Sequence, residues 1–183
     1  MKPTLANYDN GGYVPGADIV KCMAWYVVNA LVFDSSWVPH SGFKAALLRL
    51  FGARVGARVV IKPRVRIKYP WHLRLGNDVW LGEDVWIDNL AEVVIGNDVC
   101  ISQGAYLLTG NHDYKDPRFK LRLGAIRIDD GAWIGARVTV CPGVTVAQSA
   151  VVTVGSVLQA NAVANTIYRG IPAMALRARC SGD

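Results

Sequence analysis

A six-residue repeat of aliphatic residues runs from Val55 to Leu158, and it constrains the fold more than any other feature of the chain. A fixed period of this kind marks a repeat architecture. The repeated position is always Val, Ile or Leu, and it falls at residues 55, 61, 67, 75, 81, 87, 95, 101, 107, 128, 134, 140, 146, 152 and 158. The residue four positions later is almost always small, with Trp71 the bulky exception. Each unit is therefore interpreted as a short strand followed by a corner.

Three such units make one triangular coil, so the repeat predicts an all-β solenoid of about five coils with parallel strands on each flat side. The alternative of an antiparallel sheet is disfavoured, since its strands would alternate with period two and vary in turn spacing. Gly follows the aliphatic residue at 56, 76, 82, 96 and 135, where the missing side chain is expected to let the chain turn. In the first three coils the period is 20 residues, which predicts a two-residue bulge at the same corner each time.

The rhythm breaks once, between Leu107 and Ile128, where about fifteen extra residues form a protruding loop near 108–127. A long excursion from a solenoid corner is typical of a functional loop. It carries Thr109, Gly110, Asn111, His112 and Asp113, and His112 is one of only three histidines in the chain. A neutral imidazole near pH 7 accepts a proton readily, so His112 is a candidate general base. His40 and His72 are interpreted as surface or packing residues.

Five segments resemble one known family: residues 48–56, 86–89, 126–136, 140–146 and 168–177. Together they are similar to the hexapeptide-repeat acyltransferases, closest to the sugar O-acetyltransferases of the colanic-acid-biosynthesis type, over roughly residues 40–178. The resemblance implies a left-handed parallel β-helix, a homotrimer with its site between subunits, and acetyl-CoA as co-substrate. It also implies direct transfer of an acetyl group to a hydroxyl of a surface polysaccharide or its lipid-linked precursor.

The resemblance also implies roles for individual residues. His112 matches the catalytic histidine, Asp88 and Asn89 fall where the family contacts its acceptor, and the flanking Asn111 and Asp113 are further candidates for acceptor binding. The residues expected to contact the cofactor are Trp133, Gly135, Ala136, Val154, Gly155, Ser156 and Arg177. Where the family has a Thr-Lys pair and a second basic tail residue, this chain has Gln159-Ala160 and Met174, so one or two contacts are lost or moved to Arg169 or Arg179.

Two details of the chemistry stay open. The imidazolium formed during transfer needs an orienting partner on its other nitrogen, and Asp113, Asp88 and backbone carbonyls are all candidates. The tetrahedral oxyanion needs a fixed donor such as a backbone amide, which the pattern does not identify.

The net charge of +6 in 183 residues is explained most economically by a phosphorylated cofactor. Nucleic acid is disfavoured, because the repeat offers neither an aromatic platform nor a helix that fits a groove. The four cysteines, Cys22, Cys100, Cys141 and Cys180, lack metal-type spacing and are expected to be reduced packing or bystander residues in a cytoplasmic protein. The start of the chain lacks the pattern of a signal peptide, and no metal is expected.

The division of the chain follows from these patterns. Residues 1–54 form an extension with helices expected over 18–33 and 41–51, the second capped by Ser41 and stopped by Gly52. Residues 55–163 form the β-helix with its inserted loop, and residues 164–183 form a tail. The apolar stretch Cys22 to Phe33 is too short to span a bilayer. It is expected to pack on the solenoid or a neighbouring subunit, with peripheral membrane contact as the alternative.

Three rival functions remain in view. An antibiotic or xenobiotic O-acetyltransferase of the same family shares nearly all of these features, and a non-catalytic solenoid is a second alternative. A hexapeptide-repeat carbonic anhydrase would need three histidines around zinc. The spacing of His40, His72 and His112 does not place two of them on one coil, which disfavours it.

Overall fold

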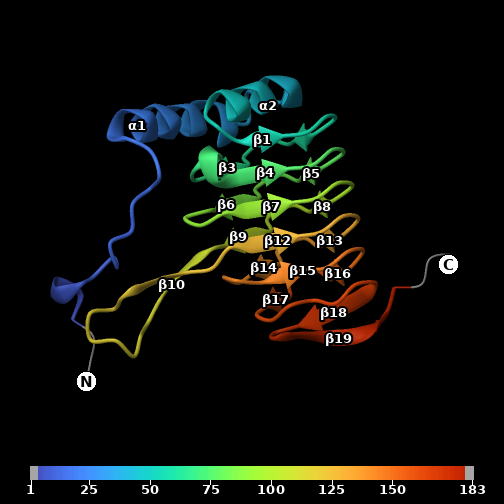
Figure 1. Cartoon of the computed structure of the whole chain (residues 1–183). Helices are drawn as coiled ribbons and strands as arrows, with labels where there is room; N and C mark the ends of the chain where they lie inside the picture. Colours follow the sequence, from blue (N-terminus) through green and yellow to red (C-terminus); the bar gives the residue numbers. More distant parts are fainter. Residues whose placement is uncertain (1–3, 180–183) are drawn as a thin grey trace.

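The computed structural model describes residues 4–179, and two helical segments lie across one end of its β-solenoid (Figure 1). Helix α1 spans Ile19–Val28 and continues into the π-helical turn η2, Asn29–Phe33, while α2 spans Ser41–Leu50. Two 3-10 turns, η1 (Leu5–Asn7) and η3 (Pro70–His72), complete the helical elements. Within the described range no helix is both long and apolar enough to cross a membrane.

The helix ends confirm the predicted spans but correct one cap. The Asp18 carboxylate accepts a hydrogen bond from the Lys21 amide, which begins α1. Helix α2 is capped by His40, whose Nδ1 accepts from the Phe43 amide at 3.1 Å, and not by Ser41. The Ser41 hydroxyl instead accepts from the Ile61 amide at 3.0 Å and ties α2 to the first coil. Gly52 takes φ +101°, the left-handed conformation expected just after a helix end.

Three sheets form the faces of the triangular prism, and their strands pair in parallel with strands one coil away, except β19, which is antiparallel to β18. The first face contains β1 (Arg54–Val55), β4 (Leu73–Leu75), β7 (Val93–Ile95), β12 (Ile126–Ile128) and β15 (Thr145–Val146). The second contains β2 (Val60–Ile61), β5 (Trp80–Leu81), β8 (Cys100–Ile101), β13 (Trp133–Ile134), β16 (Val151–Val152), β18 (Thr166–Gly170) and β19 (Ala173–Ala178). The third contains β3 (Arg66–Ile67), β6 (Trp86–Asp88), β9 (Tyr106–Leu108), β14 (Thr139–Val140) and β17 (Val157–Leu158).

The solenoid has five complete coils and part of a sixth, so the predicted count of about five was slightly low. Ala162 forms a parallel bridge to Val146, and β18 pairs in parallel with β16. Tyr168 lies opposite Val152 and is 7% exposed, so an aromatic residue fills the inward position that an aliphatic one holds elsewhere. The hexad pattern stops before this coil, which is why counting missed it. The antiparallel strand β19 then closes the end of the prism.

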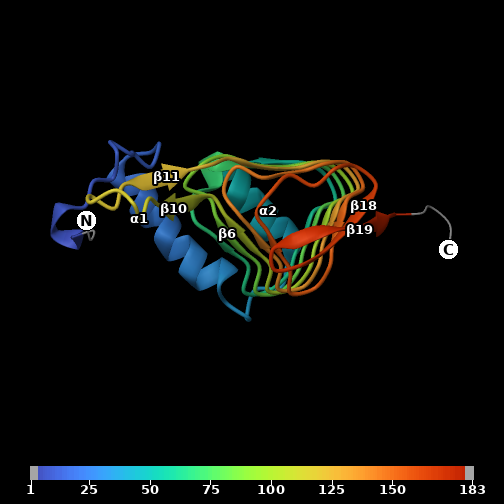
Figure 2. The same ribbon diagram turned by 90° about the horizontal axis from the view of Figure 1, so that it is seen from below.

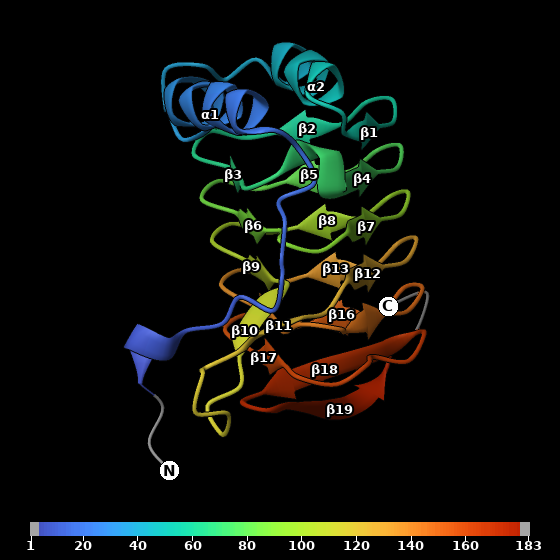
Figure 3. The same cartoon turned by 60° about the vertical axis from the view of Figure 1, so that its left-hand side comes forward.

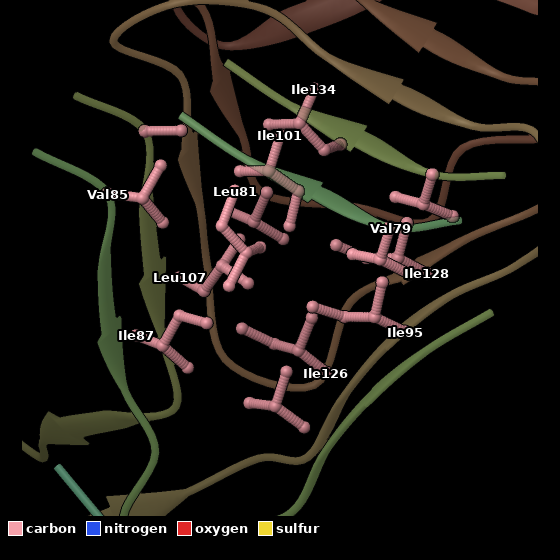
Figure 4. Close-up of a cluster of buried hydrophobic side chains, with 14 of the residues drawn as sticks. Val79, Leu81, Val85, Ile87, Ile95, Ile101, Leu107, Ile126, Ile128 and Ile134 are labelled. Carbon is pink, nitrogen blue, oxygen red and sulfur yellow. The ribbon is translucent and has the colours of Figure 1, made fainter. Parts of the chain in front are cut away.

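The core follows the predicted pattern closely (Figure 4). Every repeated aliphatic position from Ile61 to Leu158 is at most 4% exposed, and Val55 in the first strand is only partly buried. The smaller residues four positions later are also buried at most corners, including Val79, Val85 and Ala105. Burial of an aliphatic side chain contributes about 1.5–3 kcal/mol each, so this stripe supplies the main stabilisation of the prism.

The glycines after the aliphatic positions let neighbouring coils stack closely. The prediction that they let the chain turn was wrong. A Cβ on Gly76 would lie 2.6 Å from the carbonyl carbon of Gly96 in the next coil, a distance that side chains do not reach. The left-handed conformation falls two residues later, at Arg58, Asp78, Asp84, Asp98 and Arg137, with φ between 54° and 60°. Coil spacing, not backbone rotation, therefore requires glycine here.

The extra residues in each 20-residue coil all fall between the third and first faces, as predicted. They form the connections from β3 to β4 and from β6 to β7, and the long loop leaves the same corner between β9 and β12. The loop itself is an antiparallel hairpin of β10 (Gly110–His112) and β11 (Leu121–Leu123). Cys22, Cys100 and Cys141 are free thiols, and Cys180 lies outside the described residues.

Candidate active site

The hairpin that carries His112 projects from the solenoid and is held by the N-terminal segment. The Thr4 amide donates to the Pro117 carbonyl at 3.2 Å, and the Leu121 amide donates to the Asp9 carbonyl at 3.3 Å. An ion pair between Arg118 and Asp9, 3.2 Å apart, adds to this contact. The N-terminal segment then runs from the hairpin back to α1 (Figure 3). The hairpin is thus braced by a second piece of chain, which fixes the position of its histidine.

His112 is oriented by the backbone of its own hairpin. Its Nδ1 lies 3.0 Å from the Phe119 carbonyl oxygen, and its ring stacks on the Phe119 ring with centroids 4.5 Å apart. The Tyr8 ring meets it edge-on at 5.6 Å. A carbonyl only accepts, so Nδ1 is the donor in this contact, and in the neutral form of the ring Nε2 carries the lone pair. Of the orienting partners left open by the sequence, the geometry favours a backbone carbonyl.

The two aspartates have other partners. Asp113 forms an ion pair with Arg122 across the hairpin and accepts from the Lys115 amide at 3.0 Å. Asp88, at the end of β6, lies on the solenoid wall with its side chain 11% exposed. Neither carboxylate has a contact with the His112 ring among the described hydrogen bonds and ion pairs.

The Asp88 carboxylate is held between two side chains of adjacent coils. Lys68 Nζ lies 3.0 Å from Oδ1 as an ion pair, outside hydrogen-bond geometry, which leaves Oδ1 buried without a hydrogen bond. The Tyr106 hydroxyl donates to Oδ2 at 3.3 Å. Burial, and then the nearby Asp88 charge, raises the pKa of Tyr106 to about 12, so the phenol stays protonated and remains a donor. An ordered carboxylate therefore sits on the third face.

Asn89 and Asn111, both predicted to bind the acceptor, differ sharply in placement. Asn89 is fully buried, and its side-chain amide bonds both backbone groups of Tyr69, at 2.6 and 3.0 Å. Direct contact with a substrate would require these bonds to break. Asn111 is exposed on the hairpin, where its Oδ1 accepts from the His112 amide at 2.8 Å.

The residues predicted to contact the cofactor fall partly into one groove on the second face. Trp133, Gly135, Ala136 and Val154 line a cavity of about 370 Å³ together with Ser102 and Gln103. Trp133 Nε1 donates to the Ser102 hydroxyl at 2.9 Å, which holds the indole against the wall. The groove is bounded by the wall of the third, fourth and fifth coils, a shape that suits a long flexible chain lying along the solenoid.

The remaining three predicted cofactor residues are not part of the groove lining. Ser156 is 1% exposed, and its hydroxyl accepts from the Gly170 amide at 3.0 Å, which joins the fifth coil to β18. Gly155 is exposed at the corner with φ +70°. Arg177 is exposed on β19, opposite Ile167.

One chain does not bring the histidine and the groove together. Seen along the solenoid axis, the hairpin β10–β11 extends from one side of the triangle, while β18 and β19 of the second face lie on the other (Figure 2). His112 belongs to the hairpin side and Trp133 to the groove side. A site that uses both needs two copies of the chain.

Sequence reasoning missed Lys68 and Tyr106 as neighbours of Asp88. The signal was present, because strands of adjacent coils pair with a 20-residue offset in this part of the solenoid. Lys68 lies 20 positions before Asp88, and Trp86 lies 20 positions after Arg66 and before Tyr106. Reading the outward positions along that offset would have predicted the contact of Lys68 with Asp88, and it would have placed Tyr106 opposite Trp86, two residues before Asp88.

Similarity to known proteins assigns the family. No family model matches the chain. The putative colanic acid biosynthesis acetyltransferase WcaF of Escherichia coli is 40% identical over 166 residues, which cover 90% of this chain and 90% of that protein. The crystal structure of a hexapeptide-repeat-containing acetyltransferase from Vibrio cholerae superimposes with a TM-score of 0.80 at 22% identity, covering 88% of this chain and 92% of that one. The chain belongs to the hexapeptide-repeat acetyltransferases.

Membership of the hexapeptide-repeat acetyltransferases confirms the left-handed parallel β-helix that the resemblance implied. A galactoside acetyltransferase in complex with coenzyme A shares this fold, with a TM-score of 0.77 at 20% identity over 88% of this chain and 82% of that one. Among residues 4–179 no three His, Cys, Asp or Glu side chains cluster as metal ligands. The three histidines have separate contacts: His40 caps α2, His72 lies near the Asn89 carbonyl, and His112 lies on the hairpin.

Proposed function

We propose that the protein transfers an acetyl group from acetyl-CoA to a hydroxyl of a saccharide that belongs to a surface polysaccharide or its lipid-linked precursor. The relative from Escherichia coli is named for colanic acid biosynthesis, and a structural neighbour is a galactoside acetyltransferase with coenzyme A bound. The observation that carries the proposal is the hydrogen bond from His112 Nδ1 to the Phe119 carbonyl, which leaves Nε2 free to accept a proton.

In this mechanism His112 is the general base. As the acceptor hydroxyl attacks the thioester carbonyl, its proton passes to Nε2, and the new C–O bond forms a tetrahedral intermediate. The intermediate collapses by breaking the C–S bond, and the proton passes from the imidazolium to the leaving thiolate. The Phe119 carbonyl holds the ring in one orientation throughout. The protein supplies no covalent nucleophile in this scheme, so both substrates are bound together.

The groove beside Trp133 is the proposed site of the pantetheine arm. Its walls are mostly apolar, which suits the extended methylene-rich chain of the cofactor. Arg177, exposed at the end of the prism, is proposed to meet the phosphates of the cofactor. Arg179 is less available, because its guanidinium donates to the carbonyls of Gly131 and Ser149.

The proposed active unit is a homotrimer. His112 and the cofactor groove lie on different sides of one chain, and a ring of identical subunits brings the hairpin of one copy to the groove of the next. Light scattering coupled to size-exclusion chromatography tests this directly, and a monomer with full transferase activity would contradict it.

The catalytic proposal is tested by His112→Ala, with His40→Asn as the matched control. Asn keeps an acceptor at the cap of α2, so the control removes a histidine without removing the cap. General-base catalysis typically contributes about 10²–10⁴-fold, so kcat should fall by that range in His112→Ala while coenzyme A binding by calorimetry is retained. Equal transfer rates in the two variants would rule out His112 as the base.

The acceptor class is tested with a panel of saccharides and a panel of hydroxyl-bearing antibiotics, since an antibiotic acetyltransferase is the main alternative. Activity on the saccharides alone is expected. Activity only on the drugs would replace the proposed function with the alternative.

We also propose that α1 contacts the membrane surface from the cytoplasmic side. Ile19, Val20, Met23 and Val27 form one exposed apolar face, and Trp37 nearby is 92% exposed. Such a face suits the headgroup boundary, where a lipid-linked acceptor would be found. Co-sedimentation with anionic vesicles should fall in Val20→Ser/Met23→Ser relative to the wild type. Equal sedimentation of both proteins would contradict membrane contact.

A further inference from the structure

A second groove, separate from the cofactor groove, lies between α1 and the third face of the solenoid. Its volume is about 380 Å³, and it is lined from one side by Met23 and Tyr26 and from the other by Arg66, Tyr69 and Trp86. In Figure 1, α1 lies above this wall and the hairpin beside β10 lies below it, with β3, β6 and β9 between them. The third face, which forms this wall, ends at the corner from which β10, the strand with His112, leaves the solenoid.

The base of this groove is fixed by hydrogen bonds and is not formed by loose packing. Trp25 Nε1 donates to the Ile67 carbonyl at 2.8 Å, and the Ile67 amide donates to Asn29 Oδ1 at 3.1 Å. These two bonds join the helical segment to the free edge of β3. A groove held in this way needs little reorganisation when a ligand binds.

The solenoid wall of the groove carries a stack of a cation and two aromatic rings. The register places Arg66, Trp86 and Tyr106 directly above one another on neighbouring strands. The Arg66 guanidinium lies 5.0 Å from the Trp86 ring centre, and the Trp86 and Tyr106 rings are parallel within 11° at 4.5 Å. Because Arg66 covers one face of the Trp86 ring and Tyr106 the other, the exposed part of Trp86, 36% of the residue, is the apolar edge of its ring.

Arg66 is available to a ligand, in contrast to the two paired arginines of the same coil. Arg58 and Arg64 each bond an aspartate tightly, at 2.6 and 2.7 Å. The carboxylate that approaches Arg66, from Asp34, lies 3.9 Å away with both side chains nearly half exposed. Its planar guanidinium, kept in place by Trp86, is suited to a bidentate contact with a carboxylate or phosphate.

The groove is linked to the ordered carboxylate described above through Lys68, while Asp88 itself lies outside the lining. Lys68 lines the groove and forms the ion pair with Asp88, whose other oxygen accepts from the Tyr106 hydroxyl. A ligand at the exposed edge of Trp86 would have Lys68, the partner of Asp88, at one end and Arg66 at the other. The Asp88 carboxylate can accept hydrogen bonds from sugar hydroxyls, while the Arg66 guanidinium can pair with a negatively charged group.

We propose that this groove binds the acceptor and selects an anionic saccharide, with Arg66 pairing its acidic group, the edge of Trp86 contacting its ring and Asp88 accepting from its hydroxyls. The inference rests on the proposed function, because it assigns the saccharide class to that reaction. It adds Arg66 and Trp86 as specificity-determining residues, neither of which the family resemblance implied.

The test compares two sugars that differ only in charge, methyl β-D-glucuronide and methyl β-D-glucoside, in titrations of the full chain without acetyl-CoA. Indole N–H signals in NMR spectra report binding, and the Trp86 signal is assigned through Trp86→Phe. The glucuronide should bind about three- to fivefold more tightly, the range of one partly exposed ion pair, with the Trp86 signal shifting more than that of Trp133. Arg66→Gln should abolish the preference, whereas Arg58→Gln should keep it.

Several results would overturn the proposal. These are equal affinity for both sugars, binding of neither, a preference that survives Arg66→Gln, or shifts confined to Trp133. A drop in oligomer mass for Trp86→Ala would show instead that a second copy covers the groove. Because no acetyl donor is present, these outcomes are independent of whether His112 is the base, so the two proposals can fail separately.

Discussion

Replacing Asn89 with alanine separates a structural from a substrate-binding role for this residue. The sequence pattern places Asn89 at the acceptor, yet the structure buries it fully and uses both ends of its amide on the Tyr69 backbone. The alanine variant removes two hydrogen bonds, each with a net contribution of about 1 kcal/mol. It also leaves the Tyr69 amide and carbonyl unpaired at a partly buried corner, which adds a penalty of about 1–3 kcal/mol for each group that water does not reach.

The free energy of unfolding should fall by about 2–4 kcal/mol, the lower part of the possible range, because Tyr69 is only partly buried and water reaches some of its backbone. For a chain of this size 1 kcal/mol corresponds to about 2–4 °C, so Asn89→Ala should lower Tm by roughly 5–15 °C. Thermal unfolding followed by circular dichroism measures the shift. The matched comparison is Asn111→Ala, whose exposed side chain bonds only the neighbouring His112 amide and should change Tm by no more than about 2 °C.

Steady-state kinetics below the melting transition complete the test. A structural Asn89 predicts an acceptor KM close to that of the wild type in the fraction of enzyme that is folded. A variant with unchanged Tm and a severalfold higher acceptor KM would refute this reasoning and restore Asn89 to the acceptor site.

Three further predictions concern the cofactor groove, the phosphates of the cofactor and the buried Lys44 of α2. Gly135→Ala should lower Tm and weaken coenzyme A binding, because the new methyl group would lie 2.7 Å from the Val152 carbonyl oxygen. Thermal unfolding and calorimetry measure the two effects, and no change in either would contradict close stacking of the coils at this residue. Arg177→Gln should raise the KM for acetyl-CoA by about three- to tenfold with kcat retained, while Arg58→Gln should leave it unchanged, as steady-state assays would show. Burial lowers the pKa of Lys44 below its usual range, so the unfolded chain binds more protons and stability rises with pH between the folded pKa and the unfolded value near 10.5. The Lys44→Met variant should be at least as stable as the wild type at neutral pH, and its free energy of unfolding should not rise between pH 7 and pH 10. Denaturant titrations at the two pH values measure this, and an equal rise in both proteins would contradict the role of Lys44.

The sequence determined the fold because the constraint is local and repeated. The aliphatic residues that recur in steps of six from Ile61 to Leu158 indicate the inward side chains of a solenoid. The structure buries these residues as predicted. The same count located the hairpin and with it His112. Where the repeat ends the prediction weakened, and the sixth coil with Tyr168 in the core was missed.

Only the tertiary structure decided which polar side chains are available for chemistry. The sequence ranks Asn89 with Asp88 and lists three partners for His112, because adjacency in the chain does not reveal what each atom bonds. Stacking of the coils consumes the Asn89 amide on Tyr69, pairs Asp113 with Arg122, and leaves Arg66 on the face of Trp86. The physical reason is that core positions depend on a residue's own hydrophobicity, whereas hydrogen bonds and ion pairs depend on what the neighbouring coil places opposite them.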